Sequence, residues 1–181
     1  VYAVCSDVCA SAAYYIASSA DYIYANPASI VGSIGVLMDG FGFVDTLQKL
    51  GIERRLITAG SEKGFLDAFS PLTPQDRNYA QTMLNIVHEQ FIEAVKKGRG
   101  NRLKISPLTF SGLAWTGAQA LPMGLIDGFG SAGFVARDVI KNTNLIDYTK
   151  KSSFFSNIGK QIGSTFYQKF ADISHLYMHQ L

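Results

Sequence analysis

The stretch CASAAYYIASSADYIYANP, residues 9–27, joins an apolar run to an alanine-rich run and decides the fold class. Just before this stretch, the run VYAVC at residues 1–5 has the composition of a buried strand. Ser6 and Asp7 can cap the helix that the alanines predict over 10–20, and YIYANP predicts a second strand that ends before Pro27. A strand, a helix and a strand in this order predict an α/β protein.

The rest of the chain continues the alternation of strands and helices. SIVGSIGVL, residues 29–37, predicts an extended segment that Gly32 and Gly35 interrupt. Thr73 and Pro74 have the residue types of a helix N-cap and first turn. The remaining expectations are a helix over 43–50, a strand over 53–59 (ERRLITA), a loop over 60–73, a long helix over 74–97 with one apolar stripe, a short helix within 112–128 and a helix over 133–141.

The composition bounds the classes of protein that are possible. The chain has 181 residues, which predicts one domain, and a net charge of +2, which gives no basic face for nucleic acid. No apolar run reaches the roughly 18 to 20 residues that span a bilayer. Cys5 and Cys9 are interpreted as small buried thiols, because neither a disulfide framework nor a zinc site has enough partners nearby.

The two ends of the chain differ in character from its middle. Because the sequence begins inside a predicted strand, we expect it to be the C-terminal portion of a longer polypeptide, with any membrane anchor in the missing part. Lysines alternate with apolar residues in the tail, which predicts an amphipathic basic segment. We therefore expect a main domain over 1–142 and a tail over 143–181, the tail packed on protein or in contact with a membrane surface.

Ser11 lies where the first strand gives way to the first helix, and two interpretations are open. Serines at helix starts are commonly packing or capping residues. A serine at such a junction can also act as a nucleophile beside the free N–H groups of the helix's first turn. In that case the N–H of Ala12 is the natural oxyanion donor, and a second donor would lie outside this sequence.

A nucleophilic serine needs a base. Of the three histidines, His88 falls inside the long helix and His175 and His179 in the tail, so each is interpreted as a surface or packing residue. A lysine with an ordinary pKa of about 10.4 is protonated at pH 7, and burial can lower that value by roughly three units. Lys63 follows a predicted strand and precedes Phe65, Leu66 and Phe69, which suits a shielded amine.

Five ordered motifs give a resemblance to a known family. CASAAYYIASSADYIYANP, IVGSIGVL, AGSEKGFLDAFSPLTPQD, GRG and WTGAQALPMGLID follow one another as in the signal peptide peptidase A (protease IV) family, over about residues 1–140. The resemblance implies a ClpP/crotonase-like fold of repeated β-β-α units and a Ser/Lys catalytic dyad. It implies no cofactor and no metal.

The resemblance assigns roles to particular residues. It implies Ser11 as nucleophile, Lys63 as base and Ser33 as the group that holds the lysine amine. It further implies that Gly32, Ile34, Gly35 and Val36 line a cleft to which an extended peptide can add as a strand. Two departures are visible: Ala12-Ala13 replaces the family's Gly-Gly, and Thr58-Ala59-Gly60 stands where a further lysine is usual.

The implied function is the degradation of cleaved signal peptides and other hydrophobic peptides. The resemblance also implies a ring-like homo-oligomer at the bacterial inner membrane, with an extracytoplasmic catalytic domain. The alternatives are a crotonase-like acyl-CoA enzyme, which uses an oxyanion hole without a nucleophile, and a non-catalytic scaffold of the same fold. A further alternative is that the isolated chain is an inactive part of an active enzyme.

Overall fold

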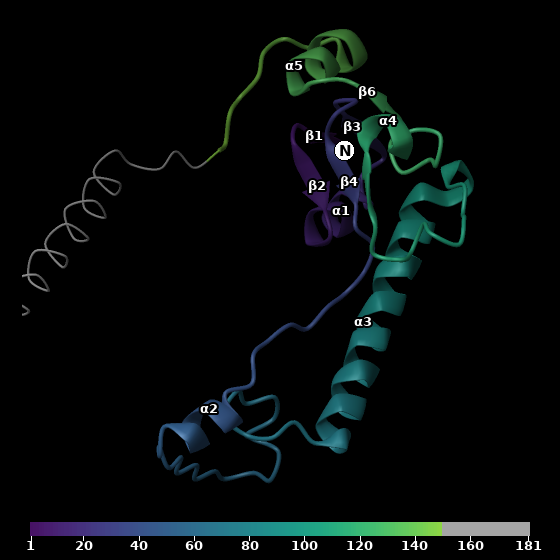
Figure 1. Cartoon of the computed structure of the whole chain (residues 1–181). Coiled ribbons are helices and arrows are strands. Elements are labelled where there is room, and N and C mark those ends of the chain that lie inside the picture. The colour runs from purple at the N-terminus through teal and green to yellow at the C-terminus, as the bar shows by residue number, and fades with distance from the viewer. Residues whose placement is uncertain (150–181) are drawn as a thin grey trace, which may run out of the picture. The chain divides into compact units, whose positions relative to one another are not determined.

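The computed structural model describes residues 1–149 and has a mixed α/β fold (Figure 1). Residues Val1–Thr143 form one compact unit, and Asn144 begins a second unit whose description ends at 149. The strands are β1 (Tyr2–Cys5), β2 (Val8–Ala10), β3 (Tyr22–Ala25), β4 (Ile30–Gly32), β5 (Ala114–Thr116) and β6 (Gly128–Phe129). The helices are α1 (Ala12–Ala17), α2 (Val44–Lys49), α3 (Pro74–Arg99), η1 (Gly100–Arg102), α4 (Gly117–Ala120), α5 (Ala132–Phe134) and η2 (Val135–Ile140), where η1 is a 3₁₀ turn and η2 a π-helix.

The strands form two small sheets. One has the order β1-β3-β6 with all strands parallel, and the other has the order β2-β4-β5, in which β2 and β4 are parallel and β4 and β5 antiparallel. Parallel neighbours need a crossover, which α1 supplies between β1 and β3 and also between β2 and β4. The short VYAVCSDVCA segment contains both β1 and β2 and thus gives one strand to each sheet.

The core lies between these sheets and the C-terminal half of α3. Tyr14, Ile23, Val31, Ile34 and Val95 are fully buried there. The hydroxyl of Tyr14 donates to the carbonyl oxygen of Leu125 at 2.7 Å, which satisfies the one polar atom of that buried ring. The same core fixes α1 in place, and with it the residue that precedes α1.

A buried ion pair connects the end of α3 to the sheet. The side chain of Arg99 is 0% exposed and makes two hydrogen bonds to the Asp127 carboxylate, at 2.8 and 2.9 Å. Asp127 also accepts from the backbone N–H of Ile23 and from Arg102. Burial by itself would raise the pKa of Asp127, but the hydrogen bonds from Arg99 and Ile23 and the charges of Arg99 and Arg102 hold it below its ordinary value.

We expect Asp127→Asn to lower the free energy of unfolding by about 3 to 5 kcal/mol, because it leaves the buried Arg99 charge without its counter-charge. Urea denaturation at pH 7 measures the change. The pKa of the carboxyl is lowered in the folded state, so its contribution is complete above the unfolded-state pKa of about 3.9 and is lost as the pH falls through the folded value. Wild type and variant should therefore converge in acid.

Asp138 provides the matched control for this prediction. It pairs with Arg137 on the surface, where both side chains are largely exposed. Asp138→Asn should change the free energy of unfolding by less than about 0.5 kcal/mol. An equal loss in both variants would mean that the Arg99–Asp127 pair has no special weight in this fold.

Several expectations from the sequence are confirmed. Strands occur at 2–5, 22–25 and 30–32, and α2 begins and ends within the range expected for it. Thr73 is the N-cap of α3: its side chain accepts from the N–H of Asp76, whose carboxylate accepts from the Thr73 N–H in return. Cys5 and Cys9 are free, buried thiols.

Other expectations are wrong. Residues 10–20 do not form one helix, because Val8–Ala10 pairs with Ile30–Gly32 as strand β2 and α1 begins only at Ala12. ERRLITA is not a strand: within residues 1–149 no strand pairs with it, and Arg54 instead binds Asp67 and Ser70. The first strand is confirmed but only Cys5 within it is buried, since Tyr2 lies on the surface stacked against Tyr22. The helix expected over 133–141 is a short α-helix followed by a π-helix.

The apolar stripe of α3 is buried only in its C-terminal half. Phe91 and Val95 lie in the core, whereas Tyr79, Met83 and Ile86 are exposed. The basic amphipathic pattern expected for the tail falls almost entirely after residue 149, outside the described residues.

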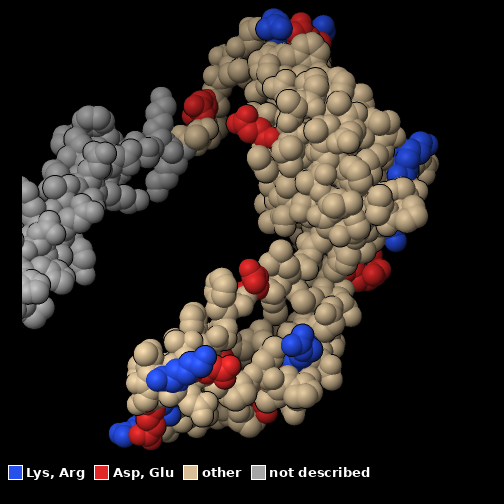
Figure 2. Space-filling model, viewed as in Figure 1, with Lys and Arg blue, Asp and Glu red and all other residues tan. Residues whose placement is uncertain are grey.

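The surface charge and the helices concern two kinds of partner, nucleic acid and the membrane. Charged side chains are scattered over the face drawn in Figure 2 and do not gather into one basic patch there. Among residues 1–149, no helix combines the length and the apolar character that crossing a membrane requires.

Candidate functional site

Ser11 occupies the single residue between strand β2 and helix α1. Its backbone angles are φ 54° and ψ −123°, a conformation that residues other than glycine rarely adopt. Although Ser11 is at the N-cap position, its side chain makes no capping hydrogen bond, and the residue is exposed. Neither a capping nor a packing role therefore accounts for this serine. A strained serine on a sharp strand-to-helix turn is also the backbone geometry of the nucleophile elbow in other hydrolases, and we refer to this turn as the elbow.

Neighbouring backbone groups hold this turn in place. The N–H of Ser11 donates to the carbonyl oxygen of Gly32 at 2.8 Å, and the carbonyl oxygen of Ser11 accepts from the N–H of Tyr15 at 2.9 Å. Gly32 has φ 95°, and a Cβ placed there would lie 2.9 Å from Cδ1 of Trp115. Glycine is thus required at this position both by its backbone angle and by the indole ring that packs on it.

Ser11 opens onto a pocket of about 550 Å³. The pocket brings together residues from α1, α3, the segment after β4 and the loop before β5. Its lining residues are Ser11, Ala12, Tyr15, Ser33, Gly35, Val36, Leu37, Val87, His88, Phe91, Ser111 and Gly112. Apart from three serines and one histidine, the side chains in this list are apolar or aromatic.

Most of the residues that the sequence assigned to a site lie at this pocket. Ser11, Ala12, Ser33, Gly35 and Val36 line it. Ala12 and Ala13, at the positions where the resemblance implies glycines, are both exposed, so their methyl groups are accommodated at the surface. Gly32 and Ile34 are buried and do not line the pocket, and they support its wall instead.

The segment from Gly32 to Gly35 forms the wall of the pocket next to Ser11. The N–H of Ser33, a residue with φ 51°, donates to the Leu113 carbonyl oxygen at 2.9 Å. The N–H of Gly35 donates to the Ser33 carbonyl oxygen at 3.0 Å, which closes a three-residue turn around Ile34. A Cβ at Gly35 would lie 2.8 Å from Cα of Gly112, so these two segments are in backbone contact.

The structure does not bring Lys63 into the pocket that Ser11 lines. Lys63 is exposed and lies in a series of turns between Gly60 and Leu66. The nearby carboxylate of Asp67 binds Arg54 and Ser70 rather than the lysine. Lys63 therefore has no ion pair with Asp67, which agrees with the requirement that a catalytic amine can become neutral. Within this single chain, however, its side chain is exposed to water.

His88 and Ser111 are pocket residues that sequence reasoning missed. His88 was interpreted as a surface or packing residue, yet it is half-buried and its Nε2 lies 3.1 Å from the carbonyl oxygen of Ile34. One signal was available: Val87, His88 and Phe91 share one face of α3 by helical spacing. Nothing in the local sequence marked the loop at Ser111 as a neighbour of Ser11.

The two cysteines lie close to the elbow but are not candidates for its chemistry. Cys9 is two residues before Ser11, and both thiols are buried in the core. The hydrogen bond between the thiols, together with burial, raises the pKa of Cys5 above its ordinary value, which keeps that thiol protonated. Among the described residues, no group of three histidine, cysteine or acidic side chains could hold a metal ion.

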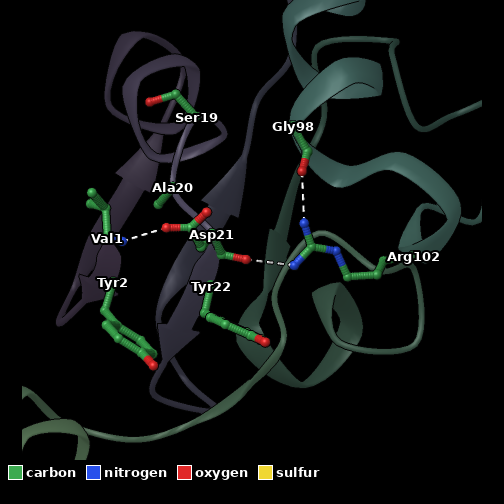
Figure 3. Close-up of a pocket in the computed structure, with 8 residues that line it drawn as sticks. All are labelled: Val1, Tyr2, Ser19, Ala20, Asp21, Tyr22, Gly98 and Arg102. Carbon is green, nitrogen blue, oxygen red and sulfur yellow. Dashed lines mark hydrogen bonds and ion pairs between the residues drawn. The ribbon is translucent and has the colours of Figure 1, made fainter. Parts of the chain in front are cut away.

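A second hollow lies elsewhere on the same unit (Figure 3). The amino group of Val1 binds the Asp21 carboxylate, and Arg102 donates to the carbonyl oxygens of Asp21 and Gly98, each at 2.7 Å. The hydroxyl of Ser19 donates to the Ile16 carbonyl oxygen within its own helix turn. Because the polar groups here already bind one another, this hollow offers no chemistry comparable to that at Ser11.

Comparison with known proteins identifies relatives for most of the chain. The model of the family described as Peptidase family S49 matches residues 1–145. The chain is similar to the Na(+)/H(+) antiporter NhaA of Brucella abortus, 47% identical over 130 residues, which are 72% of this chain and 18% of that protein. It is 34% identical over 123 residues to Protease 4 of Haemophilus influenzae, covering 67% of this chain and 20% of that protein.

A third relative is the chloroplastic serine protease SPPA of Arabidopsis thaliana, 28% identical over 174 residues, which are 91% of this chain and 26% of that protein. The chain thus spans about a fifth to a quarter of the length of these three relatives. The similarity to the antiporter is confined to 18% of that protein.

Proposed function

Because the chain belongs to peptidase family S49, we propose that it is part of a serine peptidase in which Ser11 is the nucleophile. The observation that carries this proposal is the conformation of Ser11. A φ of 54° at a non-glycine residue costs of the order of 1 to 3 kcal/mol, and here the hydroxyl gains no capping bond in return. Ser11 lines a pocket of about 550 Å³, where a peptide carbonyl can reach it.

The first helix provides the electrophilic part of the proposed mechanism. As Ser11 attacks a peptide carbonyl, negative charge develops on the carbonyl oxygen. The N–H of Ala12 belongs to the first turn of α1, whose N–H groups have no partners within the helix. It is the donor that we assign to this oxyanion, together with a second donor from outside this chain.

Lys63 is the base in the proposed Ser/Lys dyad. In its neutral form its amine would take the proton of Ser11, give it to the leaving amine, and then activate the water that hydrolyses the acyl-enzyme. Ser33, which lines the pocket with Ser11, would orient that amine. Since Lys63 is exposed in the single chain, the dyad requires either a movement of the 60–66 turns or a second copy of the chain to bring a dry amine to Ser11.

The pocket supports peptides with apolar side chains as substrates. Tyr15, Val36, Leu37, Val87 and Phe91 line it, so an apolar side chain loses water contact on entering. Both edges of β4 are already paired within the chain, whereas Val36 and the residues after it form no strand. An extended peptide can therefore add to the backbone after Gly35. Cleaved signal peptides, which are rich in apolar residues, fit these properties.

The exposed apolar side chains support self-association as part of the same proposal. Leu37 and Phe41 are 78% and 79% exposed, Ile57 is 94% exposed, and the N-terminal half of the α3 stripe is exposed as well. An uncovered apolar surface of this kind is typical of subunit interfaces. We propose a ClpP/crotonase-like homo-oligomer that acts at the bacterial inner membrane, on its extracytoplasmic side, where cleaved signal peptides are produced.

A serine-directed fluorophosphonate tests the role of Ser11 without knowledge of the substrate. The assembled protein should form a phosphonate ester at Ser11, located by mass spectrometry of the digested protein, and at neither Ser33 nor Ser111 of the same pocket. Labelling should be lost after denaturation, because the reactivity depends on the folded elbow. Absence of labelling at Ser11 in the assembled protein would favour the non-catalytic scaffold or the acyl-CoA enzyme over a peptidase.

A further inference from the structure

The imidazole of His88 makes a hydrogen bond that connects α3 to the wall of the Ser11 pocket. Its Nε2 lies 3.1 Å from the carbonyl oxygen of Ile34, and the residue itself lines the pocket. A carbonyl oxygen can only accept, so Nε2 must carry a hydrogen and donate it. Both the neutral ring with its proton on Nε2 and the doubly protonated ring satisfy this bond.

The bond is placed at the centre of the three-residue turn that forms the pocket wall. The turn is closed by the Gly35 N–H and the Ser33 carbonyl oxygen, so the carbonyl of Ile34 is not used by the turn itself. The side chain of Ile34 is fully buried, which fixes one side of the turn in the core. The bond from His88 fixes the other side, because it holds the peptide plane that joins Ile34 to Gly35.

The same turn is connected to the nucleophile. Gly32 accepts from the Ser11 N–H, and Ser33 follows Gly32 directly with φ 51°. Ser33 is a non-glycine residue with positive φ, and the tight turn that follows it makes this a strained path. Such a path keeps one geometry only when its surroundings hold it. His88 is the side chain of α3 that does so.

We propose that His88 is a positioning residue that holds the Ser33–Gly35 turn in place by donating to the Ile34 carbonyl oxygen. It thereby sets where Ser33 and Gly35 face Ser11. This assignment gives His88 no part in proton transfer. Its effect on the geometry of the wall does not depend on the proposed peptidase function, whereas its effect on turnover does.

Asparagine and glutamine separate the two ring nitrogens of His88. The side-chain nitrogen of glutamine can reach the position of Nε2, whereas that of asparagine reaches only as far as Nδ1. We expect His88→Gln to keep the bond to Ile34 and His88→Asn to lose it. Glu89→Gln, an exposed change on the same helix, is the control for altering α3.

Amide hydrogen exchange followed by NMR provides the readout that needs no activity. In His88→Asn the amides of Ser33 and Gly35 should exchange at least about tenfold faster than in wild type, the equivalent of one lost hydrogen bond. In His88→Gln and Glu89→Gln they should exchange within about threefold of wild type. Core amides such as that of Val95 should be unchanged in all three variants, which shows that the fold is kept.

Peptide hydrolysis provides the second readout. His88→Asn should lower kcat/KM by about tenfold or more, and His88→Gln should restore it to within about threefold with an unchanged pH profile between pH 5 and 8. Unchanged exchange at Ser33 and Gly35 in His88→Asn would overturn the proposal. Normal exchange but lost activity in His88→Gln would also overturn it, because the imidazole itself would then be needed. If wild type hydrolyses no peptide, the proposed function fails and the exchange data still decide the role of His88.

Discussion

Ser11→Ala should lower kcat/KM for peptide hydrolysis by a factor of about 10³ or more, to the level of the background reaction. The change removes the atom that we propose to form the acyl-enzyme. Thr116 and Ser131 also stand between a strand and a helix, but both cap their helices and have negative φ, unlike Ser11. A continuous assay with an apolar fluorogenic peptide measures the loss. The fluorophosphonate label should disappear in the same variant.

The stability of Ser11→Ala should be close to that of wild type, which separates a chemical effect from a structural one. Ser11 is exposed and its side chain makes no capping hydrogen bond, so its removal leaves no unsatisfied partner. Ser19→Ala is the control, since Ser19 lies just after the same helix and its hydroxyl donates to the Ile16 carbonyl oxygen, away from the Ser11 pocket. Ser19→Ala should retain full activity.

Ser11→Gly gives a further check on the origin of the strain. Glycine adopts φ 54° at little cost, so this variant should be inactive and yet more stable than Ser11→Ala by about 1 kcal/mol. Retention of peptidase activity in Ser11→Ala would contradict the nucleophile assignment. It would favour a site that works by oxyanion stabilisation alone, as in the acyl-CoA enzyme.

Local signals in the sequence account for what could be predicted about the fold. Thr73 and Pro74 determine the start of α3 through short-range hydrogen bonds and a fixed φ, so the residue types alone were sufficient. β2 was missed because Val8–Ala10 is strand only by pairing with Ile30–Gly32, and its sequence continues into alanines that favour helix. ERRLITA was assigned to a strand for the converse reason: it has strand-forming residues but no partner strand in the described part of the chain.

For the candidate site as well, local sequence indicated some features, whereas others depend on contacts between distant segments. The sequence placed Ser11 at a junction, but its positive φ could not be read from a residue type that seldom adopts one. His88 and Ser111 come to the pocket through the packing of α3 and of the loop before β5, which are far from Ser11 in the chain. The position of Lys63 is a similar case, because its neighbours in sequence predicted shielding that the single chain does not provide.

Lys63→Met should also lower kcat/KM by a factor of about 10³ or more, while the free energy of unfolding stays within about 0.5 kcal/mol of wild type. Methionine keeps an unbranched apolar stem and removes the amine that we propose as base. Lys63→Arg should be equally inactive, because a guanidinium stays protonated at any pH at which the protein is folded. Lys49→Met and Lys104→Met are controls at other exposed lysines, and both should keep wild-type activity.

The exposure of Lys63 in the single chain makes the source of its amine testable as well. If a neighbouring copy supplies the amine, a mixture of the inactive Ser11→Ala and Lys63→Met proteins should recover activity, because some sites then combine an intact Ser11 with an intact Lys63 from the other chain. If instead the 60–66 turns move within one chain, every chain in the mixture lacks either Ser11 or Lys63. The mixture should then stay as inactive as each variant alone. Full activity in Lys63→Met alone would remove lysine from the mechanism and require another base at Ser11.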